Sequence, residues 1–358
     1  MSLLQQTPHD FRAVRVSVDN YIIEFYATEI ARAEAVSPDY ARLWQVLGDT
    51  YLAGGKRLRP YMVVLAFHAC GGGRVEGDVL AAAAALELLH CSMLIHDDII
   101  DRDTVRHGKP NVAGQYRGVY AAHLEPAKRD HLADSAALLG GDLLIMSAHR
   151  LIAESNFSAE KRLVALRLMN DAIFNVVGGE LLDAESTTKT MSEVDSLAIA
   201  RYKTAHYSFV TPFIMGASLA GADRDTLAIL TQYGDALGVA FQLADDLLGL
   251  FGDEEETGKP ATSDLREGRR TFIMQKSYEL ASPAACAELD AIVGTEVTLE
   301  QLGRVRTIMR ECGAYDATVA EIAAYAAKAE AAVKRARFAP EFEAECLTLI
   351  GRATERRA

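Results

Sequence analysis

The stretch "VLAAAAALELLHCSMLIHDDIID", residues 79–101, decides the fold that this sequence predicts. Its first half is made of alanine and leucine, and side chains this small favour a helix that packs closely against neighbours inside a bundle. Asp78 is the expected N-cap of this helix. The stretch ends in three aspartates at positions 97, 98 and 101 with no basic residue among them, which is unusual for a surface helix.

The spacing of these aspartates indicates a metal site. Asp97 and Asp101 are expected one helical turn apart on the same face, whereas Asp98 points about 100° away. Two neighbouring carboxylates at the end of an apolar helix repel each other and lose hydration, and a divalent cation relieves both costs. Oxygen ligands without His or Cys favour magnesium over zinc. Taken alone, the motif is also compatible with a solvated helix end.

A second aspartate pair strengthens this interpretation. The stretch "FQLADDLLGLFGD", residues 241–253, places Asp245 and Asp246 in another apolar helix. Two such helices facing each other would form a cavity that holds several Mg²⁺ ions. Magnesium keeps open coordination positions for phosphate oxygens, so the two pairs predict a phosphate-bearing substrate.

Basic residues stand beside these acidic motifs and beside glycine turns. Singly, each is readily explained as a surface charge, but together they fit binding of a diphosphate through charge-assisted hydrogen bonds. They are Lys56, Arg57 and Arg59 in "GGKRLRP", Arg106 after the first aspartates, Lys203 in "YKTAHY" and Lys259 in "TGKP".

Composition limits the other possibilities. The chain has 358 residues, half of them hydrophobic, and a formal net charge of −13, which argues against nucleic-acid binding. The five cysteines are scattered without paired spacing, as expected for small core residues in a reducing compartment. We found no signal peptide and no uncharged apolar run of roughly 18 residues. These features predict a soluble, cytoplasmic protein without a membrane span.

Helical periodicity dominates the chain and predicts one all-α domain over residues 1–358. Helices are expected near residues 11–35, 40–51 and up to about 70, and a loop over 104–118. The charged segment 252–271 is too long to be an idle connection, so it is a candidate functional loop.

Five motifs together carry a resemblance to a known family. They are "GGKRLRP", "HDDIID" followed by "RHGKP", "GGELLD", "YKTAHYSF" and "FQLADDLLGLFGDEEETGKPATSDLREGRRT", in this order between residues 54 and 271. The set resembles the trans-isoprenyl diphosphate synthases, also called polyprenyl synthetases. The resemblance implies an all-α, isoprenoid-synthase-type helical bundle with a central active-site cavity, and a homodimer.

The resemblance also implies a role for each motif residue. Asp97, Asp101 and Asp245, assisted by Asp246, would bind Mg²⁺, with three ions per active site. The other site residues that it implies would contact the substrates: Arg106, Lys203 and Lys259 the allylic diphosphate, Lys56, Arg59, His90 and His107 isopentenyl diphosphate, and Thr204 and Gln242 the reacting carbons.

The implied reaction is a head-to-tail prenyl transfer. Metal ions and basic residues stabilise the leaving diphosphate of dimethylallyl, geranyl or farnesyl diphosphate, and isopentenyl diphosphate attacks the allylic cation. Residues one or two turns before Asp97 would line the path of the growing tail, namely Leu89, Ser92 and Met93. Farnesyl-making relatives commonly have an aromatic residue at position 92 or 93. Because neither is aromatic here, we predict mainly geranylgeranyl diphosphate as the product.

Three positions depart from the family pattern. Gly249 stands where a third aspartate is usual, His107 replaces an arginine, and Glu180 replaces a frequent glutamine. We considered a farnesyl or longer-chain synthase, a terpene cyclase, a noncatalytic subunit of a heteromeric synthase and a metal phosphohydrolase. The second aspartate pair and "GGKRLRP" argue against a cyclase, the retained aspartates against a noncatalytic subunit, and the lack of further His ligands against a phosphohydrolase.

Overall fold

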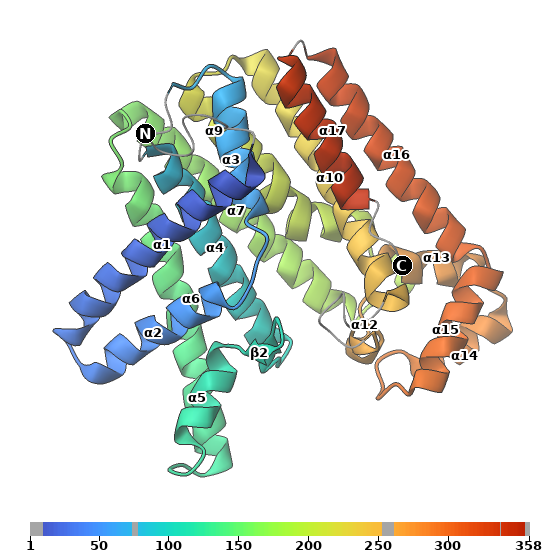
Figure 1. Cartoon of the computed structure of the whole chain (residues 1–358). Helices are drawn as coiled ribbons and strands as arrows, with labels where there is room; N and C mark the ends of the chain where they lie inside the picture. The colour runs from blue at the N-terminus through green and yellow to red at the C-terminus, as the bar shows by residue number, and fades with distance from the viewer. Residues whose placement is uncertain (1–9, 74–77, 253–260, 337, 355–358) are drawn as a thin grey trace. The chain divides into compact units, whose positions relative to one another are not determined.

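A computed structural model of the chain describes residues 10–73, 78–252, 261–336 and 338–354 (Figure 1). The chain divides into two compact units, residues 1–169 with 215–221, and residues 170–214 with 222–358. Two of the three boundaries fall within continuous helices, α7 (Ala159–Ser186) and α9 (Thr211–Ala220), and the third follows the end of α9. The prediction of an all-α fold is confirmed. The prediction of a single domain stays a prediction.

The first unit is built around α4 (Asp78–Ile100), which runs through the stretch that ends in the first aspartates. Ala83, Ala84 and Ala85 are fully buried, and α4 packs most extensively against α6 (Pro126–Glu154). A Cβ atom on Gly141 of α6 would lie 2.2 Å from the His96 ring of α4, so this glycine permits the close contact. The small side chains of α4 therefore act as the sequence predicts. Asp78 begins the helix, and its carboxylate accepts a hydrogen bond from the Asn156 amide.

Three further helices of this unit agree with the predicted ranges to within a few residues. They are α1 (Phe11–Glu34), α2 (Pro38–Leu52) and α3 (Leu58–Ala69). Two of them, α1 and α3, pack against α4. The segment predicted as a loop over 104–118 is more ordered than expected. It forms a two-stranded antiparallel ribbon, β1 (Val105–Arg106) and β2 (Lys109–Pro110), followed by α5 (Val112–Tyr120).

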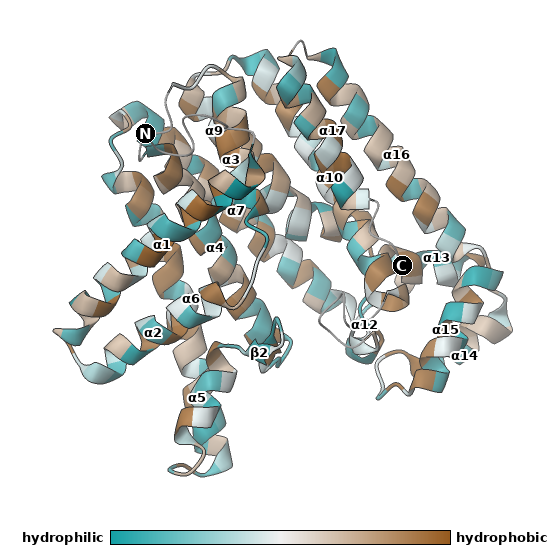
Figure 2. Ribbon diagram, viewed as in Figure 1, coloured by the Kyte–Doolittle hydropathy of each residue, from teal (hydrophilic) through white to brown (hydrophobic). Residues whose placement is uncertain are grey.

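The second unit is organised around α10 (Arg224–Phe251), which carries the second aspartate pair. It packs against η3 (Ala200–Val210), α16 (Ala314–Arg335) and α17 (Pro340–Thr354). Figure 1 shows α10, α16 and α17 running side by side. In Figure 2, α16 carries both apolar and polar residues along its length, as expected for a helix that buries one face. The remaining elements are η2 (Met191–Glu193), α8 (Ser196–Ile199), α12 (Ser263–Glu267), α13 (Phe272–Leu280), α14 (Pro283–Ile292) and α15 (Leu299–Glu311).

Helix η3 is a π-helix, a wide helical form that is rare and frequent at functional sites. Its backbone lies against glycines of two neighbouring helices. A Cβ atom on Gly238 of α10 would lie 2.4 Å from the Cα atom of Ala205. A Cβ atom on Gly179 of α7 would lie 2.1 Å from the backbone nitrogen of Lys203. These glycines bring α7 and α10 within reach of the "YKTAHYSF" motif.

Two helices, α4 and α6, are long and apolar enough to cross a membrane by length and composition alone. α4 includes Glu87 within its apolar stretch, so it is not an uncharged run. Core helices of soluble proteins have the same length and composition, and most of the apolar part of α4 is buried in the protein. Cys91, Cys286, Cys312 and Cys346 carry free thiols.

The contact of α7 with η3 predicts a difference between two helical glycines. Gly179→Ala should lower the free energy of unfolding by about 1–3 kcal/mol, because its Cβ atom would overlap backbone atoms that cannot move independently. Gly303 of α15 is exposed, and no described atom outside its own helix lies within 4 Å of a Cβ atom placed there. Gly303→Ala is therefore the control and should be neutral or stabilising. Urea unfolding measures both, and equal losses would contradict this packing.

Candidate active site

Arg106 of β1 binds the first aspartate motif. Its Nε atom donates to Asp98 Oδ1 at 2.8 Å, and its Nη2 atom lies 2.5 Å from Asp98 Oδ1 and 3.1 Å from Asp97 Oδ2. Asp98 is buried, and burial raises the pKa of its carboxyl group while Arg106 opposes this change. Asp98 therefore faces the protein, as its predicted orientation on α4 requires.

Asp101 keeps the helical spacing although α4 ends at Ile100. Its amide donates to the Asp97 carbonyl oxygen at 2.8 Å, so the two aspartates lie one turn apart. Arg102, the next residue, has a positive φ of 59°, which turns the chain toward the ribbon that carries Arg106. The predicted spacing of the first motif is thus confirmed.

The "GGKRLRP" motif lies in the same unit, and its three basic residues differ in their exposure to solvent. Lys56 is exposed and Arg59 half-buried, whereas Arg57 is only 6% exposed. The Arg59 charge influences both Glu87 and His90 of α4. The motif therefore presents Lys56 to solvent and directs Arg59 toward α4.

His90 marks a concentration of positive charge in the first unit. Burial lowers its pKa well below the usual value, and the neighbouring basic groups of Arg59, Arg106, Arg57 and His107 lower it further. These four groups come from two separate segments, residues 57–59 and residues 106–107. The structure thus brings predicted substrate-binding residues of two motifs together around one histidine, where an anionic ligand would be stabilised.

His107 lies at the turn of the ribbon and faces Gly54. It has a φ of 53°, followed by Gly108 with a φ of 72°, as in the tight turns that join two short antiparallel strands. A Cβ atom on Gly54 would lie 2.7 Å from the His107 ring, so this glycine lets the ribbon approach the "GGKRLRP" loop. Burial and the charges of Arg106 and Arg57 lower the pKa of His107, which favours the neutral imidazole.

In the second unit, Lys203 lies between two carboxylates of α7. Its Nζ atom is 2.6 Å from Asp183 Oδ2 and 3.0 Å from Glu180 Oε2. The Gly179 contact with the Lys203 backbone explains this proximity. Glu180, which departs from the family's usual glutamine, thus serves as a charged partner of Lys203.

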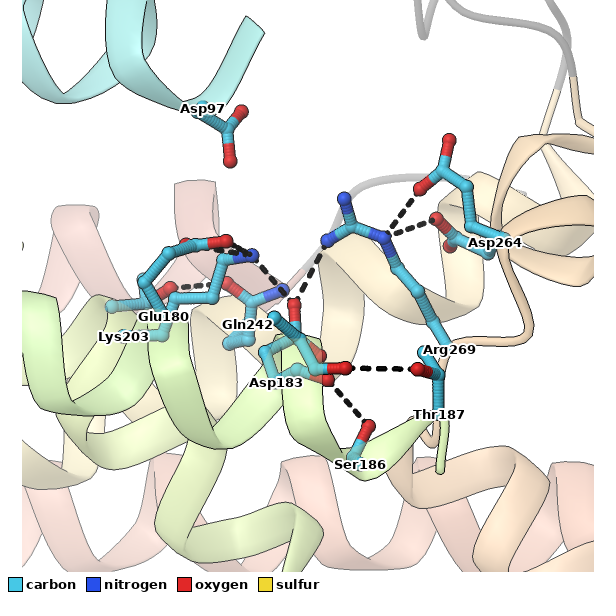
Figure 3. A network of polar contacts seen from close by, with 12 residues as sticks. Asp97, Glu180, Asp183, Ser186, Thr187, Lys203, Gln242, Asp264 and Arg269 are labelled. Atoms are coloured by element: carbon cyan, nitrogen blue, oxygen red, sulfur yellow. Dashed lines mark hydrogen bonds and ion pairs between the residues drawn. The ribbon is translucent and has the colours of Figure 1, made fainter. Parts of the chain in front are cut away.

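Arg269 binds the same carboxylate oxygen of Asp183 that Lys203 binds (Figure 3). Its Nη1 atom lies 3.0 Å from Asp183 Oδ2, and its Nε atom donates to Glu267 at 2.7 Å and lies 3.9 Å from Asp264. Asp183, Arg269 and Asp264 were not selected from the sequence, although all three stand within the quoted motifs. Nothing in the sequence alone shows that Asp183 joins Lys203 to Arg269.

Thr204 and Gln242, both predicted to lie near the reacting carbons, form one hydrogen-bonded chain with Asp246. Thr204 donates to Gln242, and Gln242 Nε2 donates to Asp246 Oδ1 at 2.6 Å. Burial first, and then the negative charges of Asp264, Asp245 and Asp183, raise the pKa of Asp246 to about 8, whereas Gln242 opposes the change. Negative charge is therefore concentrated around Asp246, which is a setting that favours a cation.

Gly249 has a structural explanation in Asp264. A Cβ atom at position 249 would lie 3.2 Å from Asp264 Oδ2. The Asp264 carboxylate, in the first turn of α12, therefore already occupies the space beside this turn of α10. The chain lacks the usual aspartate of the motif but keeps a carboxylate beside that position.

The arrangement of oxygen ligands fits magnesium held jointly with a substrate. Among the described residues, no group of three or more His, Cys, Asp or Glu side chains is arranged to hold a metal ion by itself. Each unit instead offers a pair of neighbouring aspartates, Asp97 with Asp101 and Asp245 with Asp246. Magnesium usually binds one or two carboxylates and completes its octahedron with water and phosphate oxygens. The pairs are consistent with that chemistry.

One predicted site residue cannot be placed. Lys259, expected to bind the allylic diphosphate, lies outside the described residues, as does most of the first half of the predicted functional loop. The second half of this loop, from residue 261 onward, supplies Asp264 and Arg269 to the network around Asp183.

Comparison with known proteins identifies the family. The sequence model of polyprenyl synthetases matches residues 41–311. The chain is 33% identical over 267 residues to a geranylgeranyl diphosphate synthase of Sulfolobus acidocaldarius, covering 73% of this chain and 75% of the relative. It is 30% identical over 337 residues to a geranylfarnesyl diphosphate synthase of Aeropyrum pernix, covering 93% and 96%.

A solved structure supports the same assignment. The geranylgeranyl pyrophosphate synthase of Corynebacterium glutamicum, crystallised with isoprenyl diphosphate and magnesium, aligns with a TM-score of 0.91 and 31% identity over 97% of this chain and 100% of that chain. The all-α fold and the two aspartate motifs define an isoprenoid-synthase type of protein. The chain belongs to the polyprenyl synthetase family.

His206 of η3 predicts a pH dependence of stability. Burial lowers its pKa below the ordinary value, against the opposing charge of Asp235, and its ring stacks on Tyr202. As pH falls through the ordinary histidine range, the unfolded chain takes up this proton before the folded protein does, so stability is present above that range and is lost below it. His206→Phe keeps the stacking and removes the titration.

We expect the unfolding free energy to decrease less between pH 7.5 and pH 5.5 in the His206→Phe variant than in the wild type. Urea unfolding at about these two pH values measures the difference. An equal decrease in both proteins would show that His206 does not contribute.

Proposed function

We propose that this protein is a prenyltransferase that condenses isopentenyl diphosphate with an allylic diphosphate in trans, head to tail, as one polyprenyl synthetase domain. The observation that carries the proposal is the approach of two basic motifs, in which the His107 ring beside Arg106 faces Gly54 of the "GGKRLRP" loop. A terpene cyclase has no second diphosphate to bind and would not need this arrangement. The names of the relatives support a geranylgeranyl product, and they also include a geranylfarnesyl synthase.

Asp97, Asp101 and Asp245, assisted by Asp246, are proposed to bind three Mg²⁺ ions together with the allylic diphosphate. Bound Mg²⁺ supplies positive charge that stabilises a leaving diphosphate. Asp264 is proposed to support the second motif through the position beside Gly249. The crystallised Corynebacterium glutamicum relative was obtained with magnesium, which supports this choice of metal.

We propose that the two substrates are bound by two different sets of basic side chains. Arg106, Lys203 and Lys259 bind the allylic diphosphate, and Lys56, Arg59, His90 and His107 bind isopentenyl diphosphate. Arg106 and Lys203 are held by carboxylates in the structure, which orients them before a substrate binds. When the allylic carbon–oxygen bond breaks, the electron pair leaves with the diphosphate. The π bond of isopentenyl diphosphate then forms the new carbon–carbon bond, and the released diphosphate takes the proton.

Thr204 and Gln242 are proposed to stabilise the allylic cation. Both side chains belong to one hydrogen-bonded chain that ends at Asp246. Their oxygen atoms are therefore held in place before the reaction and need not reorient when the cation forms. Exclusion of water is needed because water would quench the cation.

A homodimer is proposed from exposed apolar faces on two helices. On α6, Leu132, Leu139 and Met146 recur every seven residues, and Met146 is 67% exposed. On α7, Phe174 is 80% exposed and is followed by exposed Val177 and Leu181 on the same face. Exposed apolar stripes of this kind indicate an interface, and a second copy of the chain fits the family. Light scattering after gel filtration distinguishes one chain from two.

A cytoplasmic location stays a prediction.

The first test is direct. Purified protein is incubated with Mg²⁺, isopentenyl diphosphate and each of dimethylallyl, geranyl and farnesyl diphosphate, and the products are sized. We expect elongation that ends mainly at geranylgeranyl diphosphate. Farnesyl or longer prenyl diphosphates would support the alternative chain lengths, and a cyclic hydrocarbon would support a terpene cyclase. No turnover with any starter would support a noncatalytic subunit.

Removal of a metal-binding carboxylate should abolish turnover without unfolding the protein. Asp245→Ala should lower kcat by about a hundredfold or more, because the diphosphate loses cation stabilisation as it leaves. Asp225→Ala is the matched control, since Asp225 is an exposed residue of the same helix and should leave kcat unchanged. Circular dichroism checks that both variants keep the helical fold. Near-normal turnover of Asp245→Ala would contradict the metal assignment.

Product length should respond to residues of α4. Ser92 and Leu89 are fully buried, and Met93 is half-buried. Ser92→Phe should shorten the product to farnesyl diphosphate by filling the path of the tail, and Leu89→Ala should lengthen it by removing a barrier. Chromatography of dephosphorylated products measures both. Unchanged lengths in the two variants would place the end of the tail path elsewhere.

A further inference from the structure

Arg57 differs from the two basic residues beside it in the "GGKRLRP" motif. Lys56 is exposed and Arg59 half-buried, but the Arg57 side chain is only 5% exposed and lies inside the first unit. A buried guanidinium is costly unless carboxylates and carbonyl groups surround it. The structure supplies such partners from three helices, so Arg57 has a role that differs from direct binding of a substrate.

The guanidinium of Arg57 joins α1, the end of α2 and α4. Its Nε atom donates to Asp19 Oδ1 of α1 at 2.8 Å, and its Nη1 atom donates to Glu87 Oε1 of α4 at 3.2 Å. The same guanidinium lies 3.8 Å from the centre of the Tyr51 ring, and the Tyr51 hydroxyl is bonded to both Asp19 and Arg57. This set of four residues, Asp19, Tyr51, Arg57 and Glu87, is called the Arg57 cluster below.

The Arg57 cluster also holds the backbone of the loop that carries it. Nη1 donates to the Gly54 carbonyl oxygen at 2.7 Å, and Nη2 donates to the Tyr51 carbonyl oxygen at 3.0 Å. The Tyr51 carbonyl group lies at the end of α2, and the Gly54 carbonyl group lies in the loop before α3. Because one side chain binds both, it fixes the path of the chain from residue 51 to residue 57.

The local backbone is shaped to allow this contact. Arg57 has a φ of 56°, a conformation that is unfavourable for a long side chain, and it immediately precedes α3. Gly55 has a φ of 110°, and a Cβ atom there would lie 2.1 Å from Arg57 Nη1. The second glycine of the motif therefore makes room for the guanidinium, as the first makes room for His107.

We propose that Arg57 is a positioning residue for the isopentenyl diphosphate site, and that Asp19, which lies outside every motif, is its anchor. The inference rests on the proposed function, since it concerns how Lys56 and Arg59 are aimed. The turn at Arg57 sends its own side chain inward while its neighbour Lys56 stays at the surface. It also sets the start of α3, and Arg59 stands in the first turn of that helix.

The test uses Asp19→Asn and Arg57→Lys in the full-length protein. Both should raise the KM for isopentenyl diphosphate about tenfold or more, because a charge-assisted bond is lost and the loop is no longer held. The KM for the allylic substrate and kcat should stay within about twofold of the wild-type values. Amide hydrogen exchange over residues 52–59 should become faster in both variants.

Arg15→Gln is the matched control for Asp19. Arg15 is 48% exposed, and its Nε atom lies 3.6 Å from the other carboxylate oxygen of Asp19. Its removal leaves the Arg57 cluster intact, so neither the KM for isopentenyl diphosphate nor hydrogen exchange over residues 52–59 should change. Lys56→Ala is assayed in parallel, as the residue expected to contact isopentenyl diphosphate itself.

The outcomes separate this inference from the proposed function. If Lys56→Ala raises the KM for isopentenyl diphosphate but Asp19→Asn and Arg57→Lys do not, the positioning role is wrong and the function stands. If Asp19→Asn only lowers thermal stability and leaves KM and hydrogen exchange unchanged, the cluster is merely structural and the inference fails. If the wild type joins no allylic starter to isopentenyl diphosphate, the proposed function fails, and the exchange experiment still tests the cluster.

Discussion

The structure depends on the pairing of carboxylates with basic side chains at apolar helix surfaces. Asp98, Glu87 and Asp183 are each buried, and each binds at least one arginine or lysine from a different segment. Because an unpaired charge in such a place costs several kcal/mol, these pairs restrict how the segments can fold onto the helices. The loop before α3, the ribbon and η3 are all held in this way.

Close packing makes these pairs possible. Ions reach each other only where backbones approach, and glycines stand at several such places. Gly54 faces the His107 ring, Gly55 faces the Arg57 guanidinium, and Gly179 faces the Lys203 backbone. In "GGKRLRP", therefore, the two glycines do more than allow a turn, because they admit the side chains of His107 and Arg57.

The same pairs suit the proposed chemistry. Arg106 and Lys203 are bound by carboxylates within their own units, so less entropy is lost when a diphosphate binds them. The excess of negative charge around Asp246 differs from this pattern, because burial and three further aspartates raise its pKa to about 8. Such an excess of carboxylates favours a divalent metal ion.

The sequence alone determined the all-α class, the positions of the main helices and most of the candidate site residues. Helical periodicity and the short-range spacing of Asp97 and Asp101 are local properties, and local properties can be read from one segment. Tertiary structure decided which charges meet. Asp19 lies 38 residues from its partner Arg57. Asp183 lies 20 residues from Lys203 and 86 residues from Arg269. At these separations, no local pattern in the sequence identifies the partners. The π-helical form of η3 and the carboxylate of Asp264 beside Gly249 likewise depend on packing between separate segments, which no local pattern encodes.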